Sequence, residues 1–254
     1  MARTLKDKRA AFRALHERGC FVMPNPWDLG GAKRLEKLGF KAIASTSAGF
    51  AWSLGRDDYQ VSRDELLEHL RVLSAATGLP LNADFENGFA DAPGDVAANV
   101  KLAIDTGVAG LSIEDRAGKD LYPLPLAVER IEAARDAIGG SGENVMLVAR
   151  TEGMLIGTLD ATKAIERLAA FADAGADCLY APGVQSISDI ESMVAAVAPK
   201  PLNVLLLGSS MRVAELAAVG VRRVSIGAGF AFAAWAAFEA AAKSVRDQGH
   251  LPGD

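Results

Sequence analysis

Short apolar runs alternate with longer amphipathic stretches along almost the whole chain. Eight of the runs have the length and aliphatic content of strands, and between them the apolar positions recur with helical spacing. The predicted strands cover 21–24, 41–46, 79–84, 108–114, 145–150, 177–181, 202–206 and 223–227. The predicted helices that follow them cover 28–38, 62–77, 94–106, 125–138, 160–174, 186–197, 211–219 and 230–247. Strand and helix therefore alternate eight times.

Glycine recurs at the end of several predicted helices, just before the next strand. It stands at Gly39, Gly78, Gly107, Gly175 and Gly220, a placement typical of helix C-caps in αβ turns. The regular repetition favours one (β/α)8 barrel in a single domain over residues 1–254, with a further helix at 4–18 before the first strand. An open, doubly wound parallel sheet is the alternative, since both architectures repeat the same unit.

Composition narrows the classes of partner and compartment. The 254 residues are 50% hydrophobic and carry a net charge of -5 without a basic run, which disfavours nucleic acid and anionic membranes as partners. No apolar segment reaches the roughly 18–20 residues of a membrane span, and the charged N-terminus does not resemble a signal peptide. Cys20 and Cys178 are isolated and are interpreted as reduced, buried thiols. We therefore expect a cytoplasmic protein.

Charged residues stand where three successive strands end, in LPLNADFE, VAGLSIED and VMLVARTE. Because parallel barrel strands present their carboxyl ends on one face, Asp84, Glu86, Glu114 and Arg150 are predicted to converge there. Carboxylate oxygens favour magnesium or manganese, and zinc is disfavoured because the histidines lie in predicted helices or the tail. The guanidinium of Arg150 suits a carboxylate or phosphonate ligand, although a structural ion pair is an alternative.

Three other segments offer weaker candidates. Thr46, Ser47 and Ala48 follow the second strand, where backbone N–H groups and hydroxyls are suited to binding a carboxylate. Asn203 on the seventh strand is a possible neutral donor, and the Asp57–Asp58 pair in SLGRDDY is a candidate mobile acid or base.

Glycines and serines after the last two strands, at 208–210 and 227–229, leave open a phosphate-binding barrel.

The segments STSAGFAWSLGRDD, LPLNADFENGF, GLSIEDR, VARTE, GADCLYAPG and PLNVLL together resemble the isocitrate lyase and phosphoenolpyruvate mutase superfamily, in the same order over almost the whole chain. The resemblance implies a (β/α)8 barrel, a homo-oligomer (a dimer, or a tetramer exchanging a C-terminal helix), and magnesium-dependent chemistry on small 2-oxo or 2-hydroxy acids. It further implies the roles of individual residues. These are carboxylate binding by Thr46–Ala48, direct metal ligation by Asp84, water-mediated ligation by Glu86 and Glu114, substrate binding by Arg150 and Asn203, and a mobile acid at Asp57.

Two departures from the superfamily pattern narrow the predicted reaction. The lyases of isocitrate and methylisocitrate carry a KKCGH or KRCGH loop, whereas this chain has RAGKDLYPLP, without cysteine or histidine. Pro182 stands where the mutase branch has histidine and the lyase branch glutamate. We therefore predict a lyase, other than an isocitrate or methylisocitrate lyase, that cleaves or decarboxylates a small 2-oxo or 2-hydroxy dicarboxylic acid through an enolate. Carbon–phosphorus chemistry on phosphonopyruvate and a non-catalytic keto-acid-binding barrel remain the alternatives.

Overall fold

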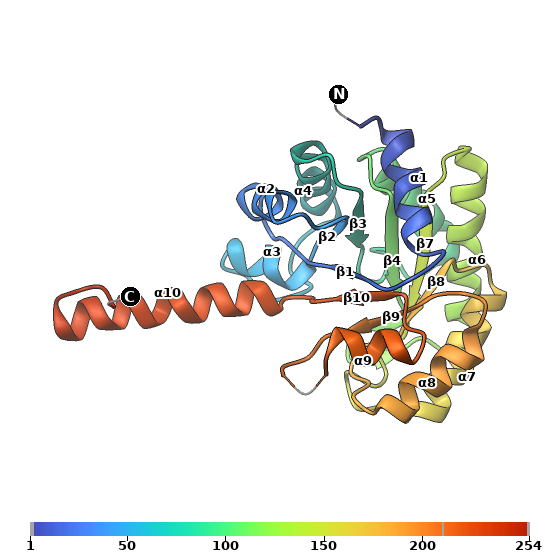
Figure 1. The fold of residues 1–254 in the computed structure, drawn as a ribbon. Coiled ribbons are helices and arrows are strands. Elements are labelled where there is room, and N and C mark those ends of the chain that lie inside the picture. Colours follow the sequence, from blue (N-terminus) through green and yellow to red (C-terminus); the bar gives the residue numbers. More distant parts are fainter. Residues whose placement is uncertain (1–2, 210, 253–254) are drawn as a thin grey trace.

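A computed structural model describes residues 3–209 and 211–252 and shows a (β/α)8 barrel (Figure 1). In chain order, its parallel strands are β1 (Phe21–Met23), β2 (Ile43–Ala44), β3 (Leu81–Asp84), β4 (Gly110–Glu114), β7 (Met146–Arg150), β8 (Cys178–Tyr180), β9 (Leu202–Leu205) and β10 (Arg223–Ser225). Within the sheet, neighbouring strands follow the order β1-β10-β9-β8-β7-β4-β3-β2. Between the two end strands, the amide of Ala44 donates to the carbonyl of Pro24 at 3.0 Å, so the barrel is nearly closed. The predicted barrel is confirmed, and the open sheet is not formed.

Helices alternate with the strands along the chain, as the sequence spacing predicts. They are α1 (Leu5–Leu15), α2 (Leu29–Lys37), α3 (Ser47–Ser53), α4 (Arg63–Ala76), α5 (Pro93–Ile104), α6 (Leu124–Ser141), α7 (Ala161–Asp173), α8 (Ile187–Val197), α9 (Val213–Ala218) and α10 (Gly229–Gln248). Two elements were not predicted: α3, and a hairpin of β5 (Arg116–Ala117) and β6 (Asp120–Leu121). Gly175, with φ of 99°, ends α7 in a conformation that favours glycine.

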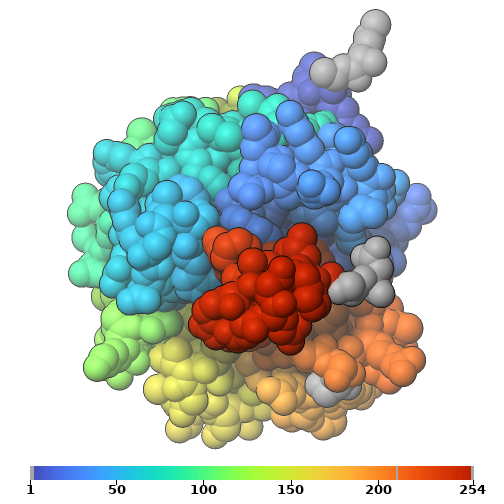
Figure 2. Space-filling model, turned by 90° about the vertical axis from the view of Figure 1, so that its left-hand side faces the viewer, coloured from blue at the N-terminus to red at the C-terminus, as the bar shows by residue number. Residues whose placement is uncertain are grey.

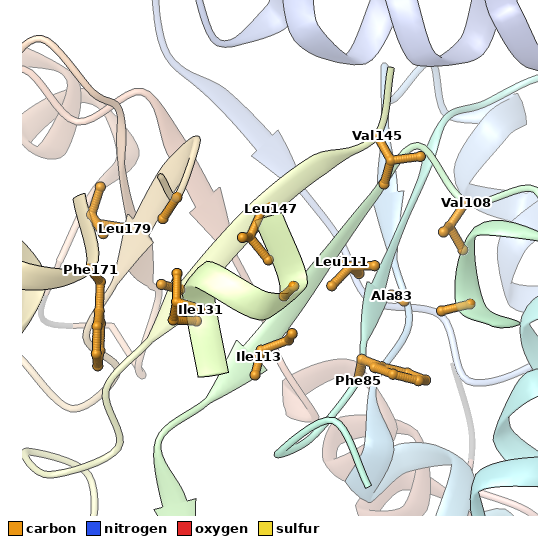
Figure 3. Packing of buried hydrophobic residues seen from close by; sticks show 14 of the residues in the cluster. Ala83, Phe85, Val108, Leu111, Ile113, Ile131, Val145, Leu147, Phe171 and Leu179 are labelled. Carbon is orange, nitrogen blue, oxygen red and sulfur yellow. The ribbon is translucent and has the colours of Figure 1, made fainter. Parts of the chain in front are cut away.

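Alternation along each strand separates the hydrophobic layer from the barrel interior. On β4, Leu111 and Ile113 belong to the main hydrophobic cluster, and Figure 3 shows them beside Leu147 of β7 and Ile131 of α6. Because side chains alternate across a strand, Glu114 faces the other way, into the barrel. The same parity turns Arg150 of β7 inward.

The first helix closes the N-terminal end of the barrel. The Phe12 side chain is fully buried in a cluster with Met23 and Met146, and His16 contacts the buried Arg223 of β10 across 3.5 Å. Burial and the neighbouring Arg223 lower the pKa of His16 to about 3. The imidazole is therefore neutral, and its Nε2 can accept a hydrogen bond from the guanidinium.

The last helix projects away from the barrel (Figure 1). Figure 2 views the molecule along α10, and the earlier parts of the chain follow one another around it in sequence order. On α10, the side chains of Phe232 and Phe238 are largely exposed, at 69% and 64%. Within the residues described, no helix is long and apolar enough to cross a membrane.

Candidate active site

A cavity of about 360 Å³ opens at the carboxyl ends of the strands. Asp84 of β3 and Arg150 of β7 line it together with Thr46–Ala48 at the start of α3, and α10 contributes Phe232. Parts of the chain that are far apart in sequence therefore meet at one opening. This is the face on which the strand-end charges were predicted to converge.

Asp84 is held at the mouth by contacts on both carboxylate oxygens. Its Oδ2 accepts a hydrogen bond from the amide of Ser47 at 3.0 Å, and its Oδ1 lies 3.2 Å from Nη1 of Arg150. Its own amide donates to the Ser45 hydroxyl at 2.8 Å. The carboxylate is thus fixed in orientation before any ligand binds.

Arg150 is the positive centre of the site. Its Nη1 lies 3.0 Å from Oε1 of Glu114, its Nε donates to Glu152, and its guanidinium carbon lies 5.2 Å from the ring centroid of Tyr180. Burial by itself would lower its pKa, but Glu114 and Glu152 raise the pKa well above the usual value. The arginine therefore remains charged, and the ion pairs that the sequence left open are present.

The acidic residues around Arg150 outnumber it, and two of them are hard to ionise. Burial raises the pKa of Glu86 to about 8, helped by repulsion from Asp84 and Glu114. Burial likewise raises the pKa of Glu114 to about 8, against the opposing effect of Arg150. Glu86 also has φ of 46°, an uncommon conformation for a non-glycine residue. A bound cation would relieve the repulsion that these carboxylates share.

The residues fit a hard divalent cation only in part. Among the described residues no three acidic, histidine or cysteine side chains are arranged as a ready-made metal site. The oxygen donors of Asp84, Glu86 and Glu114 nevertheless suit magnesium, which commonly uses one or two carboxylates and takes its other ligands from water and substrate. The predicted metal ligands are therefore compatible with a site that the substrate completes.

The predicted carboxylate-binding turn begins a helix. Thr46 is the N-cap of α3, and its hydroxyl accepts from the amide of Gly49 at 3.2 Å. Ser47 already donates its amide to Asp84, while Thr46, Ser47 and Ala48 all line the cavity. The segment therefore serves to position Asp84, and carboxylate binding there stays a prediction.

The two loop acids occupy different environments. Asp57 is exposed, and its contacts are with Gln60 of the same loop. Asp58 lines the cavity, and burial, together with the nearby Asp84, raises its pKa. Of the two loop acids, Asp58 is thus the one at the cavity, one position after the residue singled out from the sequence.

Tyr59 closes one side of the site, a contact that the sequence did not indicate. Its hydroxyl donates to Oε2 of Glu114 at 2.6 Å, across 55 positions of sequence. The guanidinium carbon of Arg116, on the β5–β6 hairpin, lies 4.6 Å from the centroid of the tyrosine ring. The hairpin thus joins the Asp57–Gln60 loop at the mouth.

Asn203 lies deeper than the cavity lining. Its Nδ2 donates to the Ser225 hydroxyl at 2.9 Å, and its Oδ1 accepts from Nε of Arg223 at the same distance. It lines a small internal space of about 30 Å³ that also touches Asp84 and Arg150. Direct substrate binding by Asn203 therefore stays a prediction, while its observed contacts are with the barrel interior.

Two acids that closely follow strands are buried beside the site, Asp115 after β4 and Glu152 after β7. Asp115 accepts from the amide of Glu152 at 2.9 Å and from Nε of Arg167 at 2.7 Å. Glu152 is fully buried beside Arg150, and its Oε2 has no hydrogen-bond partner within the part of the chain described.

Of the possible phosphate-binding segments, Gly208 and Gly227–Gly229 line the cavity, Ser209 is exposed, and Ser210 lies outside the described residues.

The chain belongs to the phosphoenolpyruvate phosphomutase family, whose profile matches residues 12–246, and so to the isocitrate lyase and phosphoenolpyruvate mutase superfamily. A solved structure from Burkholderia cenocepacia J2315, provisionally named a lyase or mutase, is 46% identical, covers 97% of this chain and 90% of its own, and has a TM-score of 0.94. The 2-methylisocitrate lyase of Escherichia coli is 31% identical over 76% of this chain and 68% of its own length. An oxaloacetate decarboxylase of Rhodopseudomonas palustris is 30% identical over 88% of this chain and 78% of its own length. The protein is an enzyme of this superfamily, a lyase.

Proposed function

We propose that this enzyme cleaves a carbon–carbon bond in a small 2-oxo or 2-hydroxy dicarboxylic acid, by lysis or decarboxylation, with magnesium or manganese. The observation that carries the proposal is that Asp84 and Glu114 both pair with Arg150, while Glu86 lies close enough to these two acids for their repulsion to raise its pKa. Carbon–carbon cleavage of small acids by the named relatives supports it. We further propose that the enzyme is cytoplasmic.

The acidic residues and Arg150 would have different roles in binding the metal ion and the substrate. Asp84 would bind the cation directly, and Glu86 and Glu114 would bind it through water. When bound, the ion would polarise the 2-oxo oxygen and stabilise the negative charge of an enolate. Arg150 would hold a substrate carboxylate with its planar guanidinium, which is oriented by its pairs with Glu114 and Glu152.

Proton transfer falls to Asp58 in this proposal, in place of the Asp57 predicted from the sequence. Burial and the nearby Asp84 raise its pKa, and it lines the cavity, so its carboxyl group is placed to exchange a proton with a bound substrate. In cleavage of a 2-hydroxy acid, it would accept the hydroxyl proton as the carbon–carbon bond breaks. The electron pair would remain on the departing carbon as an enolate, which water then protonates.

The hairpin supports a reaction without a cysteine acid. Residues 116–121 form a two-stranded turn against Tyr59, and neither thiol nor imidazole occurs between Arg116 and Pro125. A lysis that needs such an acid, as predicted for isocitrate and methylisocitrate, is therefore disfavoured.

We expect release of a 2-oxo acid from oxaloacetate or 2-alkylmalates in a panel that also contains methylisocitrate and phosphonopyruvate. EDTA should abolish the turnover, and magnesium should restore it.

Asp58→Asn should lower kcat about 100-fold, whereas Asp57→Asn should remain near wild type because that side chain is exposed and bonded to Gln60. Initial rates of product release measure both effects.

Other outcomes of this assay would contradict the proposal. Turnover of phosphonopyruvate alone would support carbon–phosphorus chemistry. If the protein turns over no member of the panel but still binds oxalate, the result would support a non-catalytic keto-acid-binding barrel. Efficient methylisocitrate cleavage would overturn the argument from the hairpin.

We also infer that the enzyme is a homo-oligomer in which α10 packs against a second copy. Phe232 and Trp235 line an apolar groove of about 430 Å³ with Trp52 of α3, and Phe238 is exposed on the same helix. A contiguous aromatic surface of this kind is typical of a protein interface. Light scattering should give a dimer or tetramer, and Phe232→Ser with Phe238→Ser should lower the mass. A monomeric wild-type chain would contradict the inference.

A further inference from the structure

A row of polar side chains crosses the barrel interior from the cavity to its deeper part. Its members are register partners on four successive parallel strands, namely Arg150 of β7, Tyr180 of β8, Asn203 of β9 and Arg223 of β10. Register partners in a parallel sheet point to the same face, and all four line the small internal space of about 30 Å³. The row therefore joins the site around Arg150 to the barrel interior.

Hydrogen bonds along this row run in one direction. A guanidinium has donors and no acceptor, so Arg223 donates to Asn203, with 2.9 Å between Nε and Oδ1. That contact fixes the orientation of the amide and turns its Nδ2 to the Ser225 hydroxyl, which accepts at 2.9 Å. Ser225 in turn donates to the hydroxyl oxygen of Tyr180 at 3.4 Å. The chain of donors thus starts at a fixed charge and ends at Tyr180.

Tyr180 keeps a proton that this chain does not use. Because its oxygen accepts from Ser225, its own proton points elsewhere, and no acceptor for it occurs among the described residues. The same tyrosine lines the cavity of about 360 Å³ beside Arg150. Burial raises the pKa of Tyr180 to about 12, against the opposing effect of Arg150, so the phenol is protonated at neutral pH. A proton donor is therefore present where a substrate would bind.

We propose that Tyr180 is the catalytic acid that hands a proton to the enolate carbon formed when a 2-oxo dicarboxylic acid loses carbon dioxide. This inference rests on the proposed function and names the group through which water supplies that proton. Asn203 and Ser225 are positioning residues, because they act by orienting the hydroxyl of Tyr180.

The proton and the electrons balance over the step. The bond between the substrate's carbon 3 and the departing carboxylate breaks, and its electron pair forms the enolate. Carbon 3 then takes the phenolic proton, and the pair of the O–H bond stays on the tyrosine oxygen. Arg150, whose guanidinium carbon lies 5.2 Å from the ring centroid, and the donating Ser225 stabilise this charge until water returns a proton.

Carbon dioxide release and pyruvate formation from oxaloacetate, followed together with magnesium, separate bond cleavage from proton transfer. In the wild type the two products should appear together, because the enolate is protonated before it leaves. In Tyr180→Phe carbon dioxide should appear first and pyruvate after a lag, because enolpyruvate leaves the enzyme and ketonises in solution. Deuterium oxide with little buffer slows that solution step, and a sample without enzyme gives the spontaneous rate to subtract.

Tyr122→Phe is the matched control. Tyr122 and Tyr180 are both buried, at 5% and 7% exposed, and each lies beside an arginine, but Tyr122 is outside the cavity lining. Tyr122→Phe should show no lag. Oxalate affinity, measured by calorimetry with magnesium, should be equal in the wild type and Tyr180→Phe, because the phenylalanine ring keeps its place beside Arg150.

Ser225→Ala tests the donor chain and decides the matter if Tyr180→Phe does not fold. Loss of one orienting hydrogen bond should lower kcat about 10-fold with KM unchanged. No lag is expected, since the phenol remains. Wild-type kcat in Ser225→Ala would overturn the donor chain on which the inference depends.

The remaining outcomes separate this inference from the proposed function. If Tyr180→Phe forms both products together, at whatever rate, another group protonates the enolate and the inference is wrong. A lag already present in the wild type would overturn it as well, and in both cases the proposed function stands. If the wild type releases no carbon dioxide from oxaloacetate, the inference fails, and the proposed function fails with it unless a 2-alkylmalate is cleaved.

Discussion

Arg150→Lys is expected to lower kcat/KM by about 100- to 1000-fold, the range found when one charge-stabilising donor is removed from an active site. Lysine keeps the positive charge beside Asp84 and Glu114 but loses the planar fork that could hold a carboxylate in two contacts. Because charge is retained, the free energy of unfolding should change by only about 1 kcal/mol. Steady-state kinetics and urea denaturation measure the two quantities.

Arg135→Lys is the matched control for this experiment. Arg135 also pairs with an aspartate, Asp177, at 2.9 Å, but that aspartate immediately precedes β8, at the end of the barrel away from the cavity. Its kcat/KM should equal that of the wild type. If Arg150→Lys instead unfolds the protein, Arg150 is principally a structural ion pair, and unchanged activity would exclude it from substrate binding.

Asp115→Ala should destabilise the protein by about 3–5 kcal/mol, the cost of breaking a buried ion pair and leaving one charge without its partner. Asp115 is 3% exposed and joins Arg167 of α7 to the backbone at Glu152. The loss should appear as a lower urea midpoint with an unchanged slope.

Glu68→Ala provides the comparison, since Glu68 and its partner Arg71 form an exposed pair on α4. Surface pairs of this type contribute about 0–1 kcal/mol. If the two substitutions lower the free energy of unfolding equally, the buried Asp115–Arg167 pair stabilises the protein no more than an exposed pair does.

Much of the fold could be predicted because strand and helix periods are local properties of the sequence. The runs that end in Asp84, Glu114 and Arg150 did form neighbouring parallel strands, so their charges lie on one face of a barrel. The predicted strands were longer than those observed, as at 41–46, where β2 covers only Ile43–Ala44. Strand ends depend on pairing with neighbours, which a single run does not encode.

The sequence by itself thus determined the repeated βα unit and the strands that would carry charge. Only the tertiary structure distinguished Asp58 from Asp57, made Asp115 a structural partner of Arg167, and brought Tyr59 to Glu114. Adjacent acids look alike in sequence, but they point in different directions once the backbone is set. Tyr59 itself has φ of 64°, a conformation that local preference disfavours and that its contacts across the barrel mouth must stabilise.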